Sequence, residues 1–447
     1  MELSAGFAEI DITPPIGTWM GGYAFRSTGC TAIHDPLFAR AAVFENAGKA
    51  IAILSMDLIG LDDRVVVAVR TGIEKETGIP AAVVMLNASH THGGPLTKSF
   101  RAMGPKNPAY TGWLTRQLIE VTKRAANGQT YPNQVLFGRA PVRIGVNRRQ
   151  YGENPEDTHI GVNPAGPVMN RVDVIAVKNW RRSVSAVLFS HACHPTTLGG
   201  SNLAITADYI GYACATIRRA LGPEVIPLFL QGCCGNINPH PRGDFGCAKK
   251  HGEALGRAVL TAIKHAEPLD GERVDYAVET LDLDQEPPPP LEECEQEVVR
   301  WEEEAARWRA EGDVGQLLNA EGMRDQAVME CEAETLGDDE WFSDVIEVQR
   351  LTLGPIQLLG FPAEMFVQYA LDFDRQAAGP VLTLGCTNGV HGYIPVAADF
   401  PFGGYEVHGA HRYYATLPYA ANCERYIRRA AYELLGIAQP DFTPNGI

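Results

Sequence analysis

The sequence lacks the segments that direct a chain into or across a membrane. No apolar run approaches the roughly 18 residues that a membrane span requires. The first residues, MELSAGFAEIDITPP, have neither the basic stretch nor the apolar stretch of a secretory signal. The ten cysteines include no C-x-x-C pair, and a disulfide between the neighbours Cys233 and Cys234 would be strained. We therefore expect reduced thiols and a cytoplasmic protein without a membrane span.

Basic residues are also scarce. Lys and Arg number 38 against 54 Asp and Glu, so the 447 residues carry a net charge of −16 at pH 7. This balance argues against nucleic acid as the main partner, because phosphate binding requires a basic face. The acidity is concentrated, since positions 291–340 hold 17 acidic and 4 basic residues and so carry −13 of the total. The rest of the chain is close to neutral.

Short apolar runs alternate with amphipathic stretches along most of the chain. Continuous apolar runs predict strands at 41–44, 50–55, 81–86, 172–177, 185–190, 226–230, 344–353, 356–361 and 381–385. Apolar residues that recur at helical spacing predict helices at 64–77, 112–126, 209–221, 249–265 and 418–435. This recurrence predicts an α/β fold, although periodicity does not give the order of the strands.

The acidic segment has the pattern of a helical hairpin. Four prolines at 287–290 end the regular structure before it. An apolar stripe at alternating spacings of three and four then predicts a helix, through Leu291, Cys294, Val298, Trp301, Ala305 and Trp308. Gly312 and Gly315 permit a turn, and 317–336 predicts a returning helix.

We interpret 287–340 as an acidic helical hairpin inserted into a domain formed by 1–286 and 341–447. Three roles are compatible with such a hairpin: a solvated arm packed by one face on the body, a lid, or a dimerisation element. We predict that 291–336 contributes to a homodimer.

Histidines gather in the loops that follow predicted strands. His90 and His92 follow the strand at 81–86, and His191 and His194 follow the one at 185–190. Loops at strand ends are where α/β proteins place ligands, and two histidine pairs can converge on one ion. Each histidine alone is equally compatible with a hydrogen-bonded core residue.

Glu364 strengthens the metal hypothesis. It lies among apolar residues in FPAEMF at 361–366, where a lone carboxylate is costly unless it is paired or coordinated. We therefore predict a zinc-type site with histidine and oxygen ligands. His34, His391 and His408 are candidates for the lining of its pocket. Arg26 is a candidate partner for an anionic substrate group, or a solvated loop residue.

Ten short motifs, in this order, resemble the neutral ceramidase family, the zinc-dependent non-lysosomal amidases of N-acyl-sphingosine. They are DITPP at 11–15, MGGY at 20–23, ARA at 39–41, SMD at 55–57, SHTHGGP at 89–95, VNR at 146–148, HPT at 194–196, ADYIG at 207–211, FPAEM at 361–365 and GYIP at 392–395. The resemblance covers roughly residues 5–435, apart from the acidic segment. It implies the mixed β-sheets with flanking helices of that family's catalytic domain.

The resemblance also implies a ligand set for Zn²⁺, namely His90, His194, Glu364 and Tyr393. His92 becomes either a residue that supports the ligands from behind or a proton-transfer residue, and Arg148 faces the substrate carbonyl. Zinc held by such ligands remains Lewis acidic and lowers the pKa of bound water towards about 7. Asp57 and Asp208 are candidates for fixing an imidazole tautomer, with a turn or helix cap as the alternative role.

The chain departs from the family pattern where the family has Gly-Asp-Val-Ser-Pro, because GNINP occupies 235–239 and Asn238 stands at the serine position. An amide can donate to a developing oxyanion but cannot act as a nucleophile. We therefore expect a zinc-dependent hydrolase of a small, relatively polar substrate, acting on an amide bond and differing from a ceramidase in substrate. An ester, lactone or glycosidic bond, or a non-catalytic ligand-binding homologue, are the alternatives.

Overall fold

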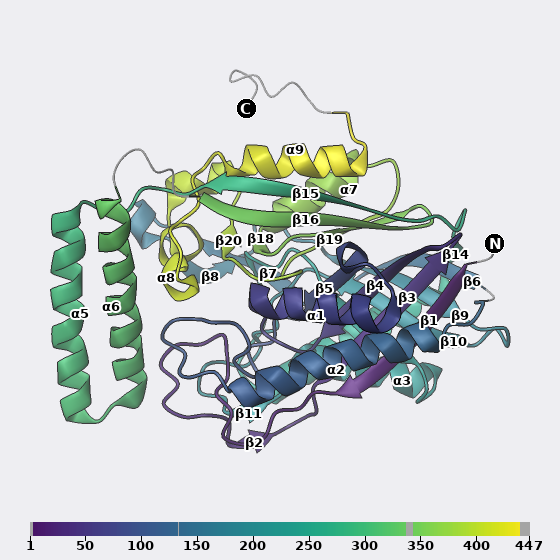
Figure 1. The fold of residues 1–447 in the computed structure, drawn as a ribbon, viewed down its shortest axis with the longest axis horizontal. Coiled ribbons are helices and arrows are strands. Elements are labelled where there is room, and N and C mark those ends of the chain that lie inside the picture. The colour runs from purple at the N-terminus through teal and green to yellow at the C-terminus, as the bar shows by residue number, and fades with distance from the viewer. Residues whose placement is uncertain (1–2, 133, 337–342, 439–447) are drawn as a thin grey trace.

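The computed structural model describes residues 3–132, 134–336 and 343–438 (Figure 1). Two sheets form its first half. The first has the order β1-β3-β4-β5, with β1 (Ser4–Asp11), β3 (Phe38–Asn46), β4 (Lys49–Met56) and β5 (Val84–Ala88). The second has the order β12-β10-β9-β6-β14, with β6 (Gln134–Pro141), β9 (Arg171–Lys178), β10 (Val184–His191), β12 (Ile226–Gln231) and β14 (Glu267–Pro268).

The two sheets pack against each other and are covered by helices on their outer faces. The shared core contains Ile53 and Leu54 from β4 and Leu228 from β12, all fully buried. The first sheet is covered by α1 (Asp63–Thr77) and α2 (Pro108–Asn127), and the second by α3 (Tyr209–Leu221) and α4 (Phe245–Lys264). Each apolar side chain buried in these layers stabilises the fold by about 1.5–3 kcal/mol.

A third sheet has its own core. Its order is β15-β16-β17-β19, with β15 (Val274–Asp284), β16 (Ser343–Leu353), β17 (Ile356–Gly360) and β19 (Val381–Leu384). The helices α7 (Val367–Gln376) and α9 (Cys423–Leu435) pack on it. Figure 1 shows α9 lying across β15 and β16.

Short strands complete the architecture near the edge where the longer strands end. They are β2 (Ala32–Ile33), β7 (Gly145–Gln150), β8 (His159–Asn163), β11 (Ala204–Ile205), β13 (Ile237–Pro239), β18 (Glu364–Met365) and β20 (Tyr393–Ile394). The strands β4–β5, β10–β12 and β17–β19 pair in parallel, whereas β1–β3, β9–β10 and β15–β16 are antiparallel. The predicted fold class, mixed sheets with flanking helices, is confirmed.

Most predicted elements are present with shifted ends. The strand predicted at 81–86 starts at Val84, because the residues after Pro80 form a short 3-10 turn, η1 (Ala81–Val83). β1, β6, β7, β15 and α7 were not predicted. In β15 most side chains alternate between partly buried and exposed positions. Acidic residues interrupt its apolar residues, so the sequence shows no continuous apolar run there.

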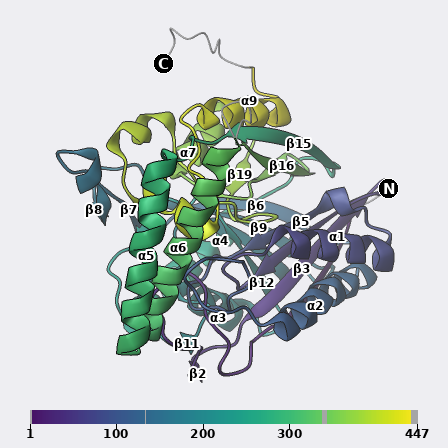
Figure 2. The same cartoon turned by 60° about the vertical axis from the view of Figure 1, so that its left-hand side comes forward.

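The acidic segment forms two helices, α5 (Leu291–Glu311) and α6 (Val314–Thr335), that lie side by side and project from the body (Figures 1 and 2). The apolar stripe of α5 faces inward, with Cys294 and Ala305 buried. α6 contacts loops of the body through two small residues. A Cβ on Gly315 would lie 2.3 Å from Phe25 O, and one on Gly322 would lie 2.7 Å from Ala102 N.

Residues 337–340 of the predicted hairpin lie outside the described residues, and the predicted division into two domains stays a prediction. None of the helices in the described ranges is long and apolar enough to span a membrane.

The close packing of α6 predicts whether one substitution raises or lowers the free energy of unfolding. A Gly→Ala change inside a helix ordinarily stabilises a protein by about 0.5–1 kcal/mol. Gly322→Ala should instead lower the free energy of unfolding by about 1–2 kcal/mol, because the new methyl group collides with the backbone of Ala102. Urea unfolding followed by circular dichroism measures this change.

Gly112→Ala is the matched control, because a Cβ on this glycine of α2 would meet only the Arg116 side chain, at 3.9 Å. It should stabilise the protein. If Gly322→Ala stabilises as much as Gly112→Ala does, the described contact between α6 and the body is wrong.

Candidate metal centre

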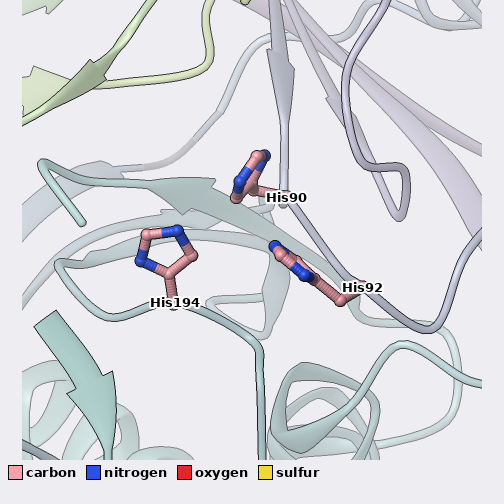
Figure 3. Close-up of side chains that lie close together, drawn as sticks. All are labelled: His90, His92 and His194. Atoms are coloured by element: carbon pink, nitrogen blue, oxygen red, sulfur yellow. The ribbon is translucent and has the colours of Figure 1, made fainter. Parts of the chain in front are cut away.

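Three histidines converge where strands of the first and second sheets end (Figure 3). His90 and His92 lie in the loop after β5, and His194 lies just after β10. The ring centroid of His90 is 5.1 Å from those of His92 and His194, and the latter two are 5.8 Å apart. One ring nitrogen of each histidine lies within 4.8 Å of the others. The structure thus brings together histidines that the sequence places about a hundred residues apart.

Backbone carbonyls fix the orientation of two of these rings. His90 Nδ1 lies 2.7 Å from Ile59 O, and His194 Nδ1 lies 2.6 Å from Cys234 O. Because a carbonyl oxygen only accepts, each Nδ1 carries a proton, and each Nε2 is the ring atom left to face the centre. Both Nε2 atoms face Oε2 of Glu364, at 3.3 Å from His90 and 2.7 Å from His194. A proton on Nε2 or a bound metal ion makes such an approach favourable, and these are the atoms that neutral imidazoles and a carboxylate present to a metal ion.

The loop that carries His90 and His92 is held in an unusual conformation. His90 has φ +65°, a left-handed conformation that costs a non-glycine residue about 1–3 kcal/mol. Its backbone N–H donates to Leu58 O at 2.8 Å. Gly22 leaves room for the neighbouring imidazole, since a Cβ there would lie 2.4 Å from the His92 ring. Burial and the nearby imidazoles hold the pKa of His92 well below its usual value, so its ring is neutral.

Glu364 and Tyr393 are neighbours because their strands pair. β18 and β20 run parallel with Glu364 opposite Tyr393, and the Glu364 N–H donates to Gly392 O at 2.8 Å. Burial would raise the pKa of Glu364, but the His90 and His194 imidazoles hold it well below its usual range. The carboxylate is therefore charged. It also accepts a hydrogen bond at Oε1 from the hydroxyl of Tyr414.

The donor set fits a divalent metal ion. Both ring nitrogens of His92 are buried and have no hydrogen-bond partner among the described residues, and His90 Nε2 has only its long 3.3 Å approach to Glu364 Oε2. Buried polar atoms in native proteins normally have a partner, so these atoms need an explanation. Two imidazoles and a carboxylate are typical zinc ligands, and the buried Tyr393 phenol lies beside them. Cys234 belongs to a second group of close donor atoms, with His194 and Glu364.

Arg148 approaches the same centre from β7. Its N–H is bonded to Asn236 O, which places Arg148 beside β13 and Asn238. Arg148 Nη1 lies 3.4 Å from His194 Nδ1 and 3.3 Å from Asn238 Oδ1. Burial would lower the pKa of Arg148, but Tyr393 and Glu406 raise it well above its usual value, so the side chain stays charged.

A buried ionic network supports Arg148 from behind. Arg148 Nε donates to Glu406 Oε1 at 2.7 Å, and Arg149 Nη1 donates to Glu406 Oε2 at 2.8 Å. Arg149 is fully buried and also donates to Asp399 Oδ1 at 2.8 Å. Because both oxygens of Glu406 are occupied, the Arg148 side chain has a fixed direction.

A cavity of about 240 Å³ opens onto this centre. His92, Arg148 and Asn238 line it, and most of the remaining wall is aromatic or apolar: Tyr23, Phe25, Met103, Ile160, Tyr393, Tyr405 and Tyr413. All the residues predicted to hold a metal or take part in catalysis therefore lie in or directly beside one cavity.

The two aspartates considered for fixing an imidazole tautomer have other partners among the described residues. Asp57 Oδ2 accepts from the backbone of Phe38 and from Arg40. Asp208 caps α3, with its Oδ1 accepting from Tyr209 N at 2.6 Å, which is the alternative role given for it above. Backbone carbonyls perform the orienting role that we expected of carboxylates, and a carbonyl leaves no trace in the sequence.

Arg26 does not serve as a substrate partner in this structure. It is buried, and its guanidinium donates to the carbonyls of Gly21, His92, Gly200 and Asn202. These bonds use its donors, so Arg26 ties the loops around the cavity together.

The three histidines that were candidates for the lining of the pocket lie outside the cavity. His34 stacks on Phe245, with 3.7 Å between ring centroids, and His408 is exposed. His391 bridges Asp63 and Asp344. Burial would lower the pKa of His391, but these two carboxylates raise it to about 9. His391 therefore joins α1 to β16 as an ion pair and does not line the cavity.

Sequence reasoning missed Tyr414, Glu406 and Cys234. Tyr414 bonds to Glu364 from 50 residues along the chain. Glu406 lies in a π-helical turn, η4 (Tyr405–Gly409). A π-turn often marks a functional site, but hydrophobic periodicity does not reveal it.

Comparison with known proteins gives a consistent family. The sequence model described as neutral/alkaline non-lysosomal ceramidase, N-terminal, matches residues 3–254. Neutral ceramidase from Drosophila pseudoobscura pseudoobscura is 23% identical over 258 residues, which are 53% of this chain and 36% of the relative. Neutral ceramidase from Pseudomonas aeruginosa is 23% identical over 465 aligned positions, covering 90% of this chain and 68% of the relative. The chain thus spans about a third of the length of the fly relatives it matches.

Solved structures share the fold. The crystal structure of the neutral ceramidase from Pseudomonas aeruginosa has a TM-score of 0.74 at 18% sequence identity, and the match covers 97% of this chain and 74% of that one. A ceramidase complexed with C2 has a TM-score of 0.74 at 15% identity, covering 100% and 77%.

The closeness of these donor atoms predicts metal content. We expect the purified protein to contain about one equivalent of a divalent metal ion, and Glu364→Ala to lose it, because the remaining imidazoles lack the carboxylate. Elemental analysis by mass spectrometry measures this directly. His34→Ala is the control and should retain the metal, since His34 lies outside the centre. A wild-type protein that stays metal-free after incubation with Zn²⁺ would contradict the assignment.

The Tyr414 hydrogen bond predicts a smaller loss of metal binding than that expected for Glu364→Ala. Tyr414→Phe removes the donor to Glu364 Oε1 and should lower metal affinity by about 10- to 100-fold, as the loss of a group that orients a ligand does. Competition with a chelator measures the affinity. Tyr413→Phe is the matched control, because no hydrogen bond of that hydroxyl is found among the described residues. Equal losses in the two variants would show that the Tyr414 bond has no special role.

Proposed function

The chain belongs to the neutral/alkaline non-lysosomal ceramidase family, and from that membership we propose that it is a zinc-dependent hydrolase that cleaves an amide bond. The observation that carries the proposal is the convergence of His90 Nε2 and His194 Nε2 on Glu364 Oε2, beside a cavity that His92 and Tyr393 line. Tyr393 completes the proposed ligand set. A zinc ion bound by such ligands polarises a carbonyl and lowers the pKa of water.

His92 is the proposed proton-transfer residue. Both of its ring nitrogens lack a hydrogen-bond partner among the described residues, and its imidazole lines the cavity. A neutral imidazole accepts a proton from attacking water and can return it to the leaving amine. Its ring packs edge to face with Tyr23, which also lines the cavity, at 4.9 Å between ring centroids.

Arg148 and Asn238 are the proposed oxyanion donors. Arg148 Nη2 is buried without a partner among the described residues, and Glu406 fixes the guanidinium. Asn238 Oδ1 accepts from Arg148 and from Thr196, so the amide nitrogen of Asn238 is left to donate. Fixed donors aimed at developing charge are effective because they need no reorganisation during the reaction.

The size of the cavity supports a small substrate. About 240 Å³ holds a compact amide, whereas the relatives are named for activity on ceramide. N-acyl-sphingosine therefore belongs in the substrate panel beside short N-acyl amides. The cytoplasmic location, and the homodimer through 291–336, stay predictions.

Hydrolysis of a panel of amides by the zinc-loaded protein tests the proposal. We expect turnover of at least one short N-acyl amide and a loss of about 10²- to 10⁴-fold in kcat for His92→Asn, because the proton-transfer group is removed while the metal ligands remain. His34→Asn is the matched control and should retain activity. Hydrolysis of esters but of no amide would favour the alternative scissile bond, and a metal-loaded protein inactive on both would contradict the proposal.

A further inference from the structure

The cavity beside the metal centre has an unusual charge for so acidic a protein. The chain carries −16, yet the described residues that line the cavity include two arginines, Arg148 and Arg242, and no Asp or Glu. The charge of Arg148 is matched by Glu406 at 2.7 Å. Arg242 therefore gives the lining of the cavity a net positive charge.

Arg242 has no anionic partner in the part of the chain that the structure describes. No carboxylate lies within 4.0 Å of its guanidinium there. The nearest acidic residue along the chain, Asp244, is engaged elsewhere, since its Oδ1 accepts from Cys247 N in the first turn of α4. Arg26 is not an alternative cation, because four backbone carbonyls occupy it.

Tyr23 fixes the position of Arg242 relative to the centre. Arg242 Nη2 donates to the Tyr23 hydroxyl at 3.0 Å, and this hydroxyl donates to Leu198 O at 2.8 Å. The Tyr23 ring lies edge to face with His92, at 4.9 Å between centroids. One tyrosine side chain thus separates the guanidinium from the imidazole. That spacing fits an anionic group a few bonds from the scissile amide.

We propose that Arg242 is a specificity residue that binds a carboxylate of the substrate, so that the substrate is an N-acyl amino acid or a similar N-acyl compound with a carboxylate near the amide. This inference rests on the proposed function. A guanidinium binds a carboxylate with two parallel hydrogen bonds, and an exposed one keeps donors free for them. The aromatic wall around Tyr405 and Tyr413 suits an apolar side chain of such a substrate.

A matched pair of substrates tests the proposal. N-acetyl-L-phenylalanine and N-acetylphenethylamine differ only in the carboxylate. We expect wild-type kcat/KM to be about 10- to 100-fold higher for the carboxylate compound, chiefly through KM, and Arg242→Gln to bring the ratio close to one. Arg242→Glu should reverse it. Arg181→Gln, which changes an exposed arginine outside the cavity, is the control.

A binding measurement keeps this proposal separate from the proposed function. N-methylsulfonyl-L-phenylalanine and its analogue without the carboxylate are not hydrolysed as amides, and calorimetry gives their affinities for wild type and Arg242→Gln. A carboxylate preference that depends on Arg242, without any amide turnover, would support this inference and contradict the amidase. Turnover of both amides with equal kcat/KM would support the amidase and overturn the role of Arg242. Absence of both turnover and preference would overturn both.

Discussion

The site depends on the approach of two imidazole nitrogens to one carboxylate oxygen. His90 and His194 present Nε2 to Glu364 Oε2 because their Nδ1 protons are held by the carbonyls of Ile59 and Cys234. The approach is favourable when a proton or a metal ion is shared between the nitrogens and the oxygen. A divalent cation at the point of convergence would contact all three groups at once, and this distinguishes a candidate metal site from a histidine-rich core.

The surrounding architecture maintains that approach at some cost. His90 adopts a left-handed backbone, and a glycine at position 22 leaves room for His92. Arg149 is fully buried, which is tolerable only because Asp399 and Glu406 satisfy it. Arg149, Asp399 and Glu406 are not among the residues that line the cavity, but through Glu406 they fix the direction of Arg148. These arrangements lower stability locally and hold the site in a defined geometry.

The sequence predicted the parts of this arrangement that depend on local pattern. Apolar runs located most of the central strands, and the histidine loops follow from the ends of those strands. The proposed ligand positions came from the family resemblance, which short motifs such as SHTHGGP carry. By contrast, Asp57 and Asp208 were candidates for orienting the imidazoles, with a turn or cap as the alternative, and they bond to Arg40 and to the start of α3. Every residue has a backbone carbonyl like that of Ile59, so the residue type does not indicate which carbonyl orients an imidazole.

Metal ligands and residues that select a substrate also differ in how far the sequence reveals them. Ligands must be of a few residue types at fixed distances, and this leaves a recognisable sequence pattern. A residue that sets specificity is recognised by the hydrogen-bond donors that the folded structure leaves free, and the sequence does not show these. Arg26 and Arg242 are indistinguishable in the sequence, yet four carbonyls accept from the first, whereas within the described ranges the second donates to the hydroxyl of Tyr23. The net charge is equally uninformative about the cavity. Most of the −16 lies in positions 291–340, so total acidity says little about a cavity whose charged lining residues, among those described, are arginines.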